Sequence, residues 1–584
     1  MKNSEVREPL LASKKGGFRT IPFIIANEAF EKVASFGLTA NMIMYLMNEY
    51  HMDMATGSNL LFIWSSFSNL LPVVGAYFAD SFVGRFRMIA YGSIFSFLGT
   101  LLLWLTTMIP QAKPPPCIIS TFESQCLGPT FYQLVLLCSS FLLMSVGAGG
   151  IRSASVAFGA EQLEDSDTLK QAGAMETFLG WYNAMTALSV VIAITFIVYI
   201  QEKFGWRVGF GVPAVLMLVS ALSFFMASSL YRNANMSKSS LMTGLVQVVV
   251  AACRKKGVVS TVSDGNKANS LYYRLKESTI LVPSDKLSYF NKACIIEDAE
   301  NDLTTDGKPS NPWRLCTIDQ VEDLKRLIKL IPIWSTGILM TVNLSQNTFP
   351  IIQVNSMDRH ITPTFQIPAA SFTIFMILSM IAWIVIYDRI LIPTASKIMG
   401  KPANLSPITR IGLGLCFAFL SMIVRASVET TRRSLAHELG IVDDPTSVVP
   451  MSAMWLLPQN MLMGVAEALC VVGQTELYMS ELPRGMWSLS SCLSGIAGGI
   501  GGLVAGLMMN GIDLVSKRGG KESWISSNIN KGHYDYYCIV LAGVCLVNLV
   551  YFIICSRAYE NTNGRVRVKK NEEENVSKCE EVAN

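Results

Sequence analysis

The stretch NEAFEK, residues 27–32, lies inside an otherwise apolar run that extends over residues 21–47. In a helix, Glu28, Glu31 and Lys32 fall at positions i, i+3 and i+4, so two carboxylates and one ammonium group share one face. If the run crosses a bilayer, each charge near its centre costs about 2.5 to 3.5 kcal/mol and must face protein or water. The stripe therefore marks a functional site, a structural ion pair that pins neighbouring helices, or a helix lying in the membrane interface.

The composition of the chain is that of a membrane protein. Of its 584 residues, 51% are hydrophobic and 15% are charged, whereas an ordinary soluble domain has about 25% charged residues. The net charge of +4 is small, and no basic patch is interleaved with aromatic residues, so we expect a lipid bilayer and no nucleic acid as partner. The four histidines are widely separated and the cysteines form no CxxC pair, so no metal site is expected.

Hydropathy predicts twelve membrane helices in two sets of six, separated by a long polar insert. The predicted spans are 22–47, 58–82, 86–109, 131–160, 176–200 and 207–230, and then 326–354, 367–395, 408–430, 450–480, 487–515 and 534–556.

These spans divide the chain into an N-terminal six-helix bundle at 22–230 and a C-terminal six-helix bundle at 326–556. We expect a cytoplasmic N-terminal tail at 1–21, a cytoplasmic linker with lateral helices at 231–325, and a charged, disordered cytoplasmic tail at 557–584. The fold class is therefore an all-α membrane protein with twelve transmembrane helices.

The distribution of Lys and Arg places the N-terminus in the cytoplasm. Two loops disagree: one contains Arg432 and Arg433, and the other contains three basic residues within 517–521. In this orientation Cys117 and Cys126 share a short loop on the oxidising side, which makes them a candidate disulfide.

A short polar stretch after the second span, GAYFADSFVGRFR at residues 75–87, resembles the cytoplasmic motif of the major facilitator superfamily. In that motif a carboxylate and a guanidinium form a latch between helices joined by a short loop. The resemblance assigns Asp80, Gly84 and Arg85 to the latch; the alternative is that the charges are solvated loop residues.

The charged stripe itself is similar to the ExxE[K/R] signature of the proton-coupled oligopeptide transporters and of their plant relatives, the nitrate transporter/peptide transporter family. Further similar segments are GGIR at 149–152, AFGAEQ at 157–162, LIPIW at 330–334, IPAAS at 367–371, YDR at 387–389, PQ at 458–459 and GVAE at 464–467. The resemblance implies a major facilitator superfamily fold of two six-helix bundles and symport by alternating access.

The resemblance also implies roles for individual residues. Glu28 and Glu31 would take and release the proton, with Lys32 as their counter-charge. Arg152 and Glu467 fall where the family has a Lys and Glu pair, and they would form a gate between the bundles or bind substrate. The alternative for Arg152 and Glu467 is separate pairing within each half.

The chain departs from the family pattern in two places. Peptide-transporting relatives continue the signature with aromatic residues, but Val33, Ala34 and Ser35 follow it here. In span seven, Asn343 stands where a nitrate-transporting relative has a histidine, and an amide cannot become cationic. Asn343, Gln346 and Asn347 form a polar patch that either lines the substrate cavity or makes interhelical hydrogen bonds.

Span eleven is rich in glycine, which predicts close helix packing, because the spacing does not make GxGxxG and no strand precedes it. These glycines are Gly495, Gly498, Gly499, Gly501, Gly502 and Gly506.

We therefore expect a proton-coupled symporter, with low-affinity nitrate as its solute, in the plant plasma membrane. The alternatives are a carrier of a larger organic anion, such as a plant hormone or glucosinolate, a peptide carrier, a nitrate-sensing receptor, or a proton-independent channel. No enzyme activity and no cofactor other than the coupling proton are expected, and the protein would act as a monomer or a homodimer.

Overall fold

The computed structural model describes residues 16–583 apart from a few short stretches. The stretches outside the description are residues 117, 120–123, 164–167, 233–240, 258–271, 275–281, 285, 299–301, 305–307, 347, 401–404, 484–485 and 487.

The N-terminal half is a bundle of long helices. Its elements are α1 (Ile21–Asn48), α2 (Met54–Phe78) with the π-turn η1 (Ala79–Val83), α3 (Arg85–Met108), η2 (Pro110–Ala112), β1 (Ile118–Ile119), β2 (Ser124–Gln125), α4 (Phe131–Gln162), α5 (Thr168–Ile192), η3 (Ala193–Ile197), α6 (Val198–Met226) and η4 (Ala227–Ser229).

The C-terminal half repeats this pattern. Its elements are α10 (Ile318–Ser345), α11 (Thr348–Asn355), β3 (Met357–Asp358), β4 (His360–Thr362), β5 (Phe365–Gln366), η6 (Ala369–Thr373), α12 (Ile374–Ile386), η7 (Tyr387–Leu391), α13 (Ile392–Met399), α14 (Pro407–Glu438), β6 (Val449–Ser452), η8 (Ala453–Leu456), α15 (Leu457–Glu481), α16 (Ser488–Ser516) and α17 (Tyr534–Ala583).

Ten helical stretches of the described chain are long and apolar enough to cross a membrane. One of them, Gly173–Ser229, has 57 residues and would extend about 85 Å, far more than the roughly 30 Å of hydrocarbon in a bilayer. It breaks at Gly205, where φ is 77°, and so supplies two spans. The charged helix α1, which is not among the ten, brings the number to the twelve that the sequence predicts.

Three of the helix ends that differ from the predicted ones change the placement of charged or polar residues. α10 begins at Ile318 instead of 326, because the Thr317 hydroxyl accepts from the Gln320 amide and forms a capping box. α14 continues to Glu438, so that Arg432 lies inside a helix and not in the loop where the sequence placed it. α17 runs to Ala583, whereas residues 557–584 were expected to be disordered.

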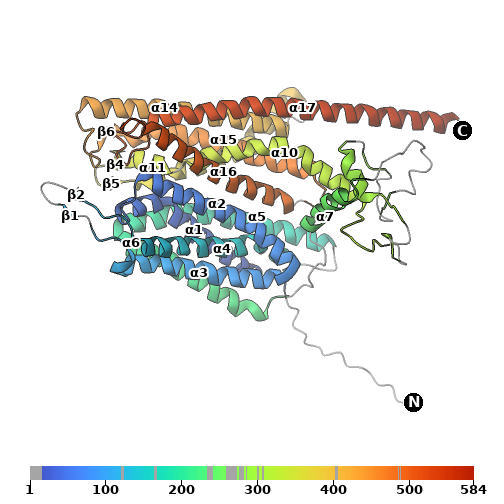
Figure 1. Cartoon of the computed structure of the whole chain (residues 1–584), viewed down its shortest axis with the longest axis horizontal. Helices are drawn as coiled ribbons and strands as arrows, with labels where there is room; N and C mark the ends of the chain where they lie inside the picture. Colours follow the sequence, from blue (N-terminus) through green and yellow to red (C-terminus); the bar gives the residue numbers. More distant parts are fainter. Residues whose placement is uncertain are drawn as a thin grey trace, which may run out of the picture.

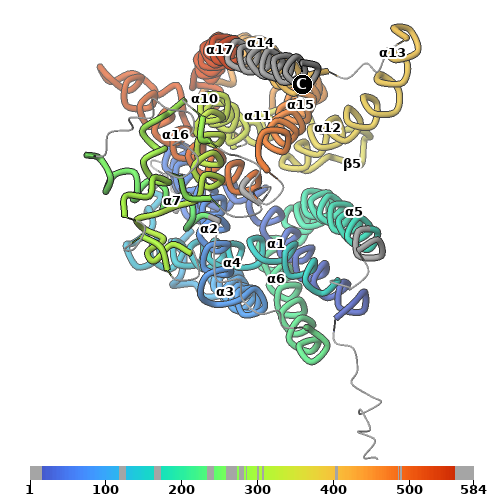
Figure 2. The backbone as a smooth tube through the Cα atoms, turned by 90° about the vertical axis from the view of Figure 1, so that its right-hand side faces the viewer, coloured from blue at the N-terminus to red at the C-terminus, as the bar shows by residue number. Residues whose placement is uncertain are grey.

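The two halves lie face to face, with the N-terminal helices on one side and the C-terminal helices on the other (Figures 1 and 2). The most extensive contact between the two halves is that of α2 with α16. The glycines of α16 allow this approach, because an added Cβ at Gly499 would collide with Leu70 and one at Gly502 with Ser66. The close packing expected for span eleven is therefore a packing between the halves.

Further contacts join the halves at the end of the molecule that the Lys and Arg distribution assigns to the outside. Arg359 forms an ion pair with Glu202 at 3.0 Å, and the Ser371 hydroxyl donates to the Ile194 carbonyl at 2.8 Å. The Ser527 hydroxyl accepts from the Met54 amide at 3.0 Å. Three polar contacts thus join the halves at this end.

The segment between the halves folds against the start of α10. Its helix α7 (Leu241–Arg254) contacts α10 and the turn η5 (Ser288–Cys294), as Figure 1 shows beside the bundle. Val248, Cys294 and Val321 belong to one small buried apolar cluster at this junction. The linker is thus attached to the C-terminal half by a core of its own.

Candidate functional site

The charged stripe of α1 is buried inside the N-terminal half. Glu28 and Glu31 are only 2% and 1% exposed, since α1 packs against α4, α5 and α6. The Lys32 ammonium lies 3.7 Å from the Glu28 carboxylate, one helical turn away. The stripe therefore faces protein, as its charge requires, and does not lie in the membrane interface.

Arg152 on α4 completes the cluster. Its Nε donates to Glu31 Oε2 at 2.9 Å and its Nη2 donates to Glu31 Oε1 at 2.8 Å. The same Nη2 lies 2.9 Å from the Ser35 hydroxyl, to which it donates. This two-pronged contact is the strong form of an arginine and carboxylate pair.

The environment of the cluster leaves room for a change of partners. A cavity with an empty volume of about 230 Å³ adjoins Glu31, and Ser35, Trp64 and Ser68 are among its lining residues. Glu28 Oε2 is buried without a hydrogen-bond partner, while Tyr182 of α5 is a close polar neighbour of Glu28. One carboxylate is thus fully engaged, while the other keeps a free oxygen that could hold a proton.

The predicted contact between Arg152 and Glu467 is not formed in this structure. Arg152 is engaged by Glu31 of its own half, which is the pairing that the sequence left as the alternative. Glu467 lies on α15 in the other half and makes no ion pair or hydrogen bond with any residue that the structure describes. A gate between the two would require Arg152 to leave Glu31.

The predicted latch is assembled at the end of α2. Arg85 Nε donates to Asp80 Oδ1 at 3.0 Å and Arg85 Nη1 donates to Glu161 Oε1 at 2.8 Å. Gly84 has φ 85°, a conformation that residues with a side chain rarely adopt. Glu161 is not among the predicted latch residues, although it lies in the segment 157–162 that carries the family resemblance.

The predicted polar patch of span seven is divided. Asn343 lines a cavity within the C-terminal half. Gln346 instead accepts a hydrogen bond from the Tyr537 hydroxyl of α17 at 2.9 Å, which is the interhelical alternative. Asn347 lies outside the residues that the structure describes.

The candidate disulfide is described at one end only. Cys126 is disulfide-bonded, and Cys117, its expected partner, is outside the described residues. In the part of the chain that is described, no group of three His, Cys, Asp or Glu side chains could hold a metal ion.

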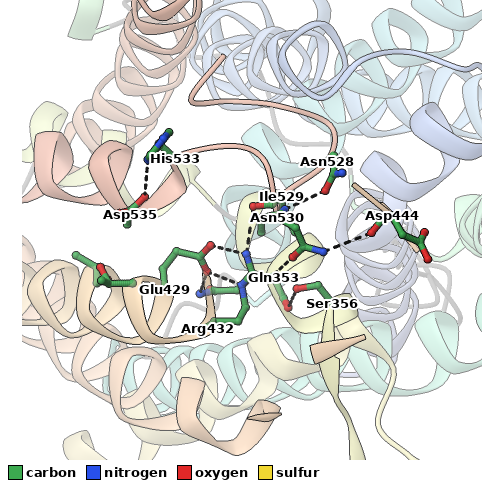
Figure 3. A network of polar contacts seen from close by, with 12 residues as sticks. Gln353, Ser356, Glu429, Arg432, Asp444, Asn528, Ile529, Asn530, His533 and Asp535 are labelled. Carbon is green, nitrogen blue, oxygen red and sulfur yellow. Dashed lines mark hydrogen bonds and ion pairs between the residues drawn. The ribbon is translucent and has the colours of Figure 1, made fainter. Parts of the chain in front are cut away.

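A second buried charge network was not predicted. In Figure 3, Arg432 lies against Glu429 and Asn530 at the outer end of the C-terminal half. Arg432 and Glu429 are both 0% exposed and are joined by two hydrogen bonds of 2.9 and 2.7 Å. Gln353 donates to the same carboxylate at 2.7 Å. The pairing with Glu429 neutralises one of the five basic residues that disagree with the predicted orientation.

A family model and the sequences of similar proteins point to the same family. The sequence pattern of the POT family matches residues 86–525. Protein NRT1/PTR FAMILY 1.2 of Arabidopsis thaliana is 50% identical over 568 residues, which are 96% of this chain and 93% of that protein. Protein NRT1/PTR FAMILY 1.1 of the same plant is 48% identical over 571 residues, covering 97% and 96%.

Solved structures share the fold. A crystal structure described as an auto inhibited POT family peptide transporter has a TM-score of 0.65 and 16% identity, covering 92% of this chain and 97% of that one. The in meso crystal structure of the POT family transporter PepTSo has a TM-score of 0.63 and 17% identity, covering 93% and 98%. At these identities the likeness concerns the fold alone.

Proposed function

The chain belongs to the POT family of proton-coupled transporters, and from this premise we propose that it carries a small anion together with protons by alternating access, with nitrate at low affinity as the first candidate. The observation that carries this proposal is the buried pair of Glu31 and Arg152. It joins an acceptor for a proton to a cation that can hold an anion.

The pair offers a direct way to couple the two ligands. While Glu31 is ionised, it occupies the guanidinium of Arg152 through both oxygens. A proton on Glu31 removes the negative charge and weakens this contact, so that Arg152 becomes free to bind an anion or to reach Glu467. Each ligand then favours the binding of the other, which is the thermodynamic basis of symport.

The residues that line the cavity beside Glu31 support an anionic solute. Ser35 and Ser68 are among them. Ser35, which replaces part of the aromatic stretch of peptide-carrying relatives, accepts from Arg152. The site is thus built around a cation, and Val33, Ala34 and Ser35 stand where peptide-carrying relatives begin their aromatic stretch.

The proposal is tested with nitrate-evoked currents in frog oocytes at external pH values of about 5.5 and about 7.5, between which the supply of protons changes by about a hundredfold. We expect inward current in the wild type that is favoured by acid. Both Glu28→Gln and Glu31→Gln should lose the dependence on pH. Acid-favoured current that persists unchanged in both variants would contradict proton coupling through this site.

A matched control is Glu49→Gln, because Glu49 lies at the outer end of the same helix and pairs with Lys113. This variant should keep the pH dependence of the wild type. A second test exchanges the charges of Arg152 and Glu467: transport that survives the exchange but neither single change would support a gate between these two residues.

The location of the protein belongs to the same proposal. Twelve helices that cross a bilayer make a multi-pass membrane protein, and we propose that it resides in the plasma membrane. A fluorescent fusion expressed in plant cells should co-localise with a plasma-membrane dye, and signal confined to the vacuolar membrane would contradict this location.

A further inference from the structure

A second polar cavity lies within the C-terminal half, apart from the charge cluster of α1. All its lining residues fall between Asn343 and Met463. They come from α10, α11, η6, α12, η8, α14 and α15. In Figure 2, α14 and α15 lie on the side of the molecule away from α3, α4 and α6.

Arg425 is the one charged residue that lines this cavity. It lies in the apolar stretch of α14 and is only 3% exposed. Its Nε and Nη1 atoms are buried without a hydrogen-bond partner, and within the described chain no carboxylate lies at ion-pair distance from it. A buried guanidinium in this state is unstable unless something in the cavity compensates its charge.

The nearest carboxylate on α14 does not supply that compensation. Glu429, one turn further on, accepts two hydrogen bonds from Arg432 and one from Gln353. The one carboxylate that α14 carries within a turn of Arg425 is therefore engaged by other residues.

Two amide side chains of the same cavity also lack partners. Gln459 is 0% exposed, and neither its Oε1 nor its Nε2 has a hydrogen-bond partner. Asn343 Nδ2 donates to the Leu339 carbonyl at 3.2 Å and to Cys545 at 3.1 Å, while Asn343 Oδ1 is left unpartnered. Three residues with unpartnered polar atoms, one on each of three helices, thus line the same cavity.

The geometry points to an oxyanion as the occupant. We propose that this cavity binds the planar oxyanion group of a small solute, a carboxylate or nitrate, with Arg425 as its charged ligand and the Gln459 amide as a second donor. Water could satisfy hydrogen bonds but would leave the charge uncompensated. The planar fork of a guanidinium fits two oxygens of such an anion.

The site goes beyond the pair of Glu31 and Arg152, because it needs no proton and shares no residue with that pair. Only the identification of its occupant with the transported solute rests on the proposed function. Binding is measured on purified protein without transport, so that the two proposals can fail separately.

The test is the thermal unfolding of the full-length protein in lipid nanodiscs, with sodium nitrate, sodium acetate or sodium chloride at equal ionic strength. Nitrate or acetate should raise the melting temperature of the wild type more than chloride does, and the better of the two identifies the class of oxyanion. Equal shifts with all three salts would overturn the proposal.

The deciding variant is Arg425→Met, which removes the charge and keeps much of the volume. It should melt at a higher temperature than the wild type in the absence of anion, and the anion concentration needed for half of the shift should rise at least about tenfold. A lower melting temperature with an unchanged anion shift would overturn the proposal. Gln459→Met is the second variant, and it should weaken the anion shift without abolishing it.

Arg410→Met is the matched control on the same helix, because Arg410 pairs with Glu476 at 2.7 Å and with the Tyr387 hydroxyl. It should lower the melting temperature and keep the anion shift. Glu31→Gln should also keep the shift while losing acid-favoured current. Loss of the shift in Arg410→Met would argue against a site specific to Arg425.

Discussion

Arg152 in the N-terminal half and Arg425 in the C-terminal half are both arginines in the apolar part of a helix, and they differ in what surrounds them. Arg152 is held by two hydrogen bonds to Glu31, and Glu28 with Lys32 completes a set of charges that balance. Arg425 has no carboxylate partner in the described chain, although it is buried more deeply.

The difference teaches what each arginine can respond to. A paired arginine is released when its carboxylate takes up a proton, so its availability depends on the proton concentration. An unpaired arginine is already available, so it can bind an anion without the prior uptake of a proton. The anion symport that we propose needs both kinds of response, and the two arginines lie in different halves.

Arg432 provides the strongest contrast, because it is a fully buried arginine with a complete set of partners. Arg432→Met would leave the carboxylate of Glu429 buried beside Gln353 alone. Removing one member of a buried pair costs about 3 to 5 kcal/mol, so this should be the largest loss of stability among the variants considered. Thermal unfolding in nanodiscs measures it.

The control for this variant is Arg433→Met, because Arg433 is the next residue of the same helix and faces His533 instead of a carboxylate. It should lower the melting temperature much less. If Arg432→Met stabilised the protein, as expected for Arg425→Met, the distinction between paired and unpaired arginines would fail.

Arg152→Gln tests the pair that we assign to coupling. At neutral pH it should cost about 1 to 3 kcal/mol, the penalty for leaving a buried polar group without its partner. The loss should shrink in acid, because a protonated Glu31 needs no counter-charge. Unfolding measured at several pH values checks this, and a loss that is independent of pH would indicate a purely structural pair.

Arg359→Gln removes an ion pair at the outer end of the molecule. Arg359 and Glu202 are 16% and 34% exposed, so solvent screens their attraction and the loss of stability should be only about 0.2 to 1 kcal/mol. High salt should abolish the difference between wild type and variant. A larger effect would mean that this contact between the halves also holds the outer end closed.

Asp444 should show the smallest effect, because hydroxyl and amide groups hold it and no cation of the described chain forms an ion pair with it. Hydrogen bonds from Ser447 and Thr446 lower the pKa of Asp444 to about 2. The stabilisation is therefore complete above the ordinary pKa of about 4 and is lost as the pH falls through about 2. Protection of the Thr446 amide from hydrogen exchange should persist below pH 4 in the wild type and not in Asp444→Ala.

Much of the fold could be predicted from the sequence, because a bilayer imposes a length and an apolar composition on each span. The helix that carries Glu28, Glu31 and Lys32 was recognised in spite of its charges, since the charges share one face. The start of α10 was placed late, because its first turns at 318–325 are polar and pack on the linker instead of in the bundle.

The site was predicted less completely, because the partner of each charged side chain depends on which helices lie next to each other in this conformation. The sequence pointed to Arg152 but paired it with Glu467, whereas the packing of α1 against α4 brings Glu31 to it. Arg425 was not recognised at all. The sequence does contain a signal, since Arg425 is a charge inside the predicted span 408–430, and a charge inside an apolar span indicates a functional site.

The glycine-rich contact between α2 and α16 has a mechanical consequence. Where Gly499 and Gly502 meet Leu70 and Ser66, one of the two surfaces has no side chains to interlock with the other. A helix surface without protruding side chains offers little steric resistance to rotation. The two halves can therefore rotate as rigid bodies about this contact while staying packed against each other. Each end of the molecule can then open and close while α2 and α16 remain in contact.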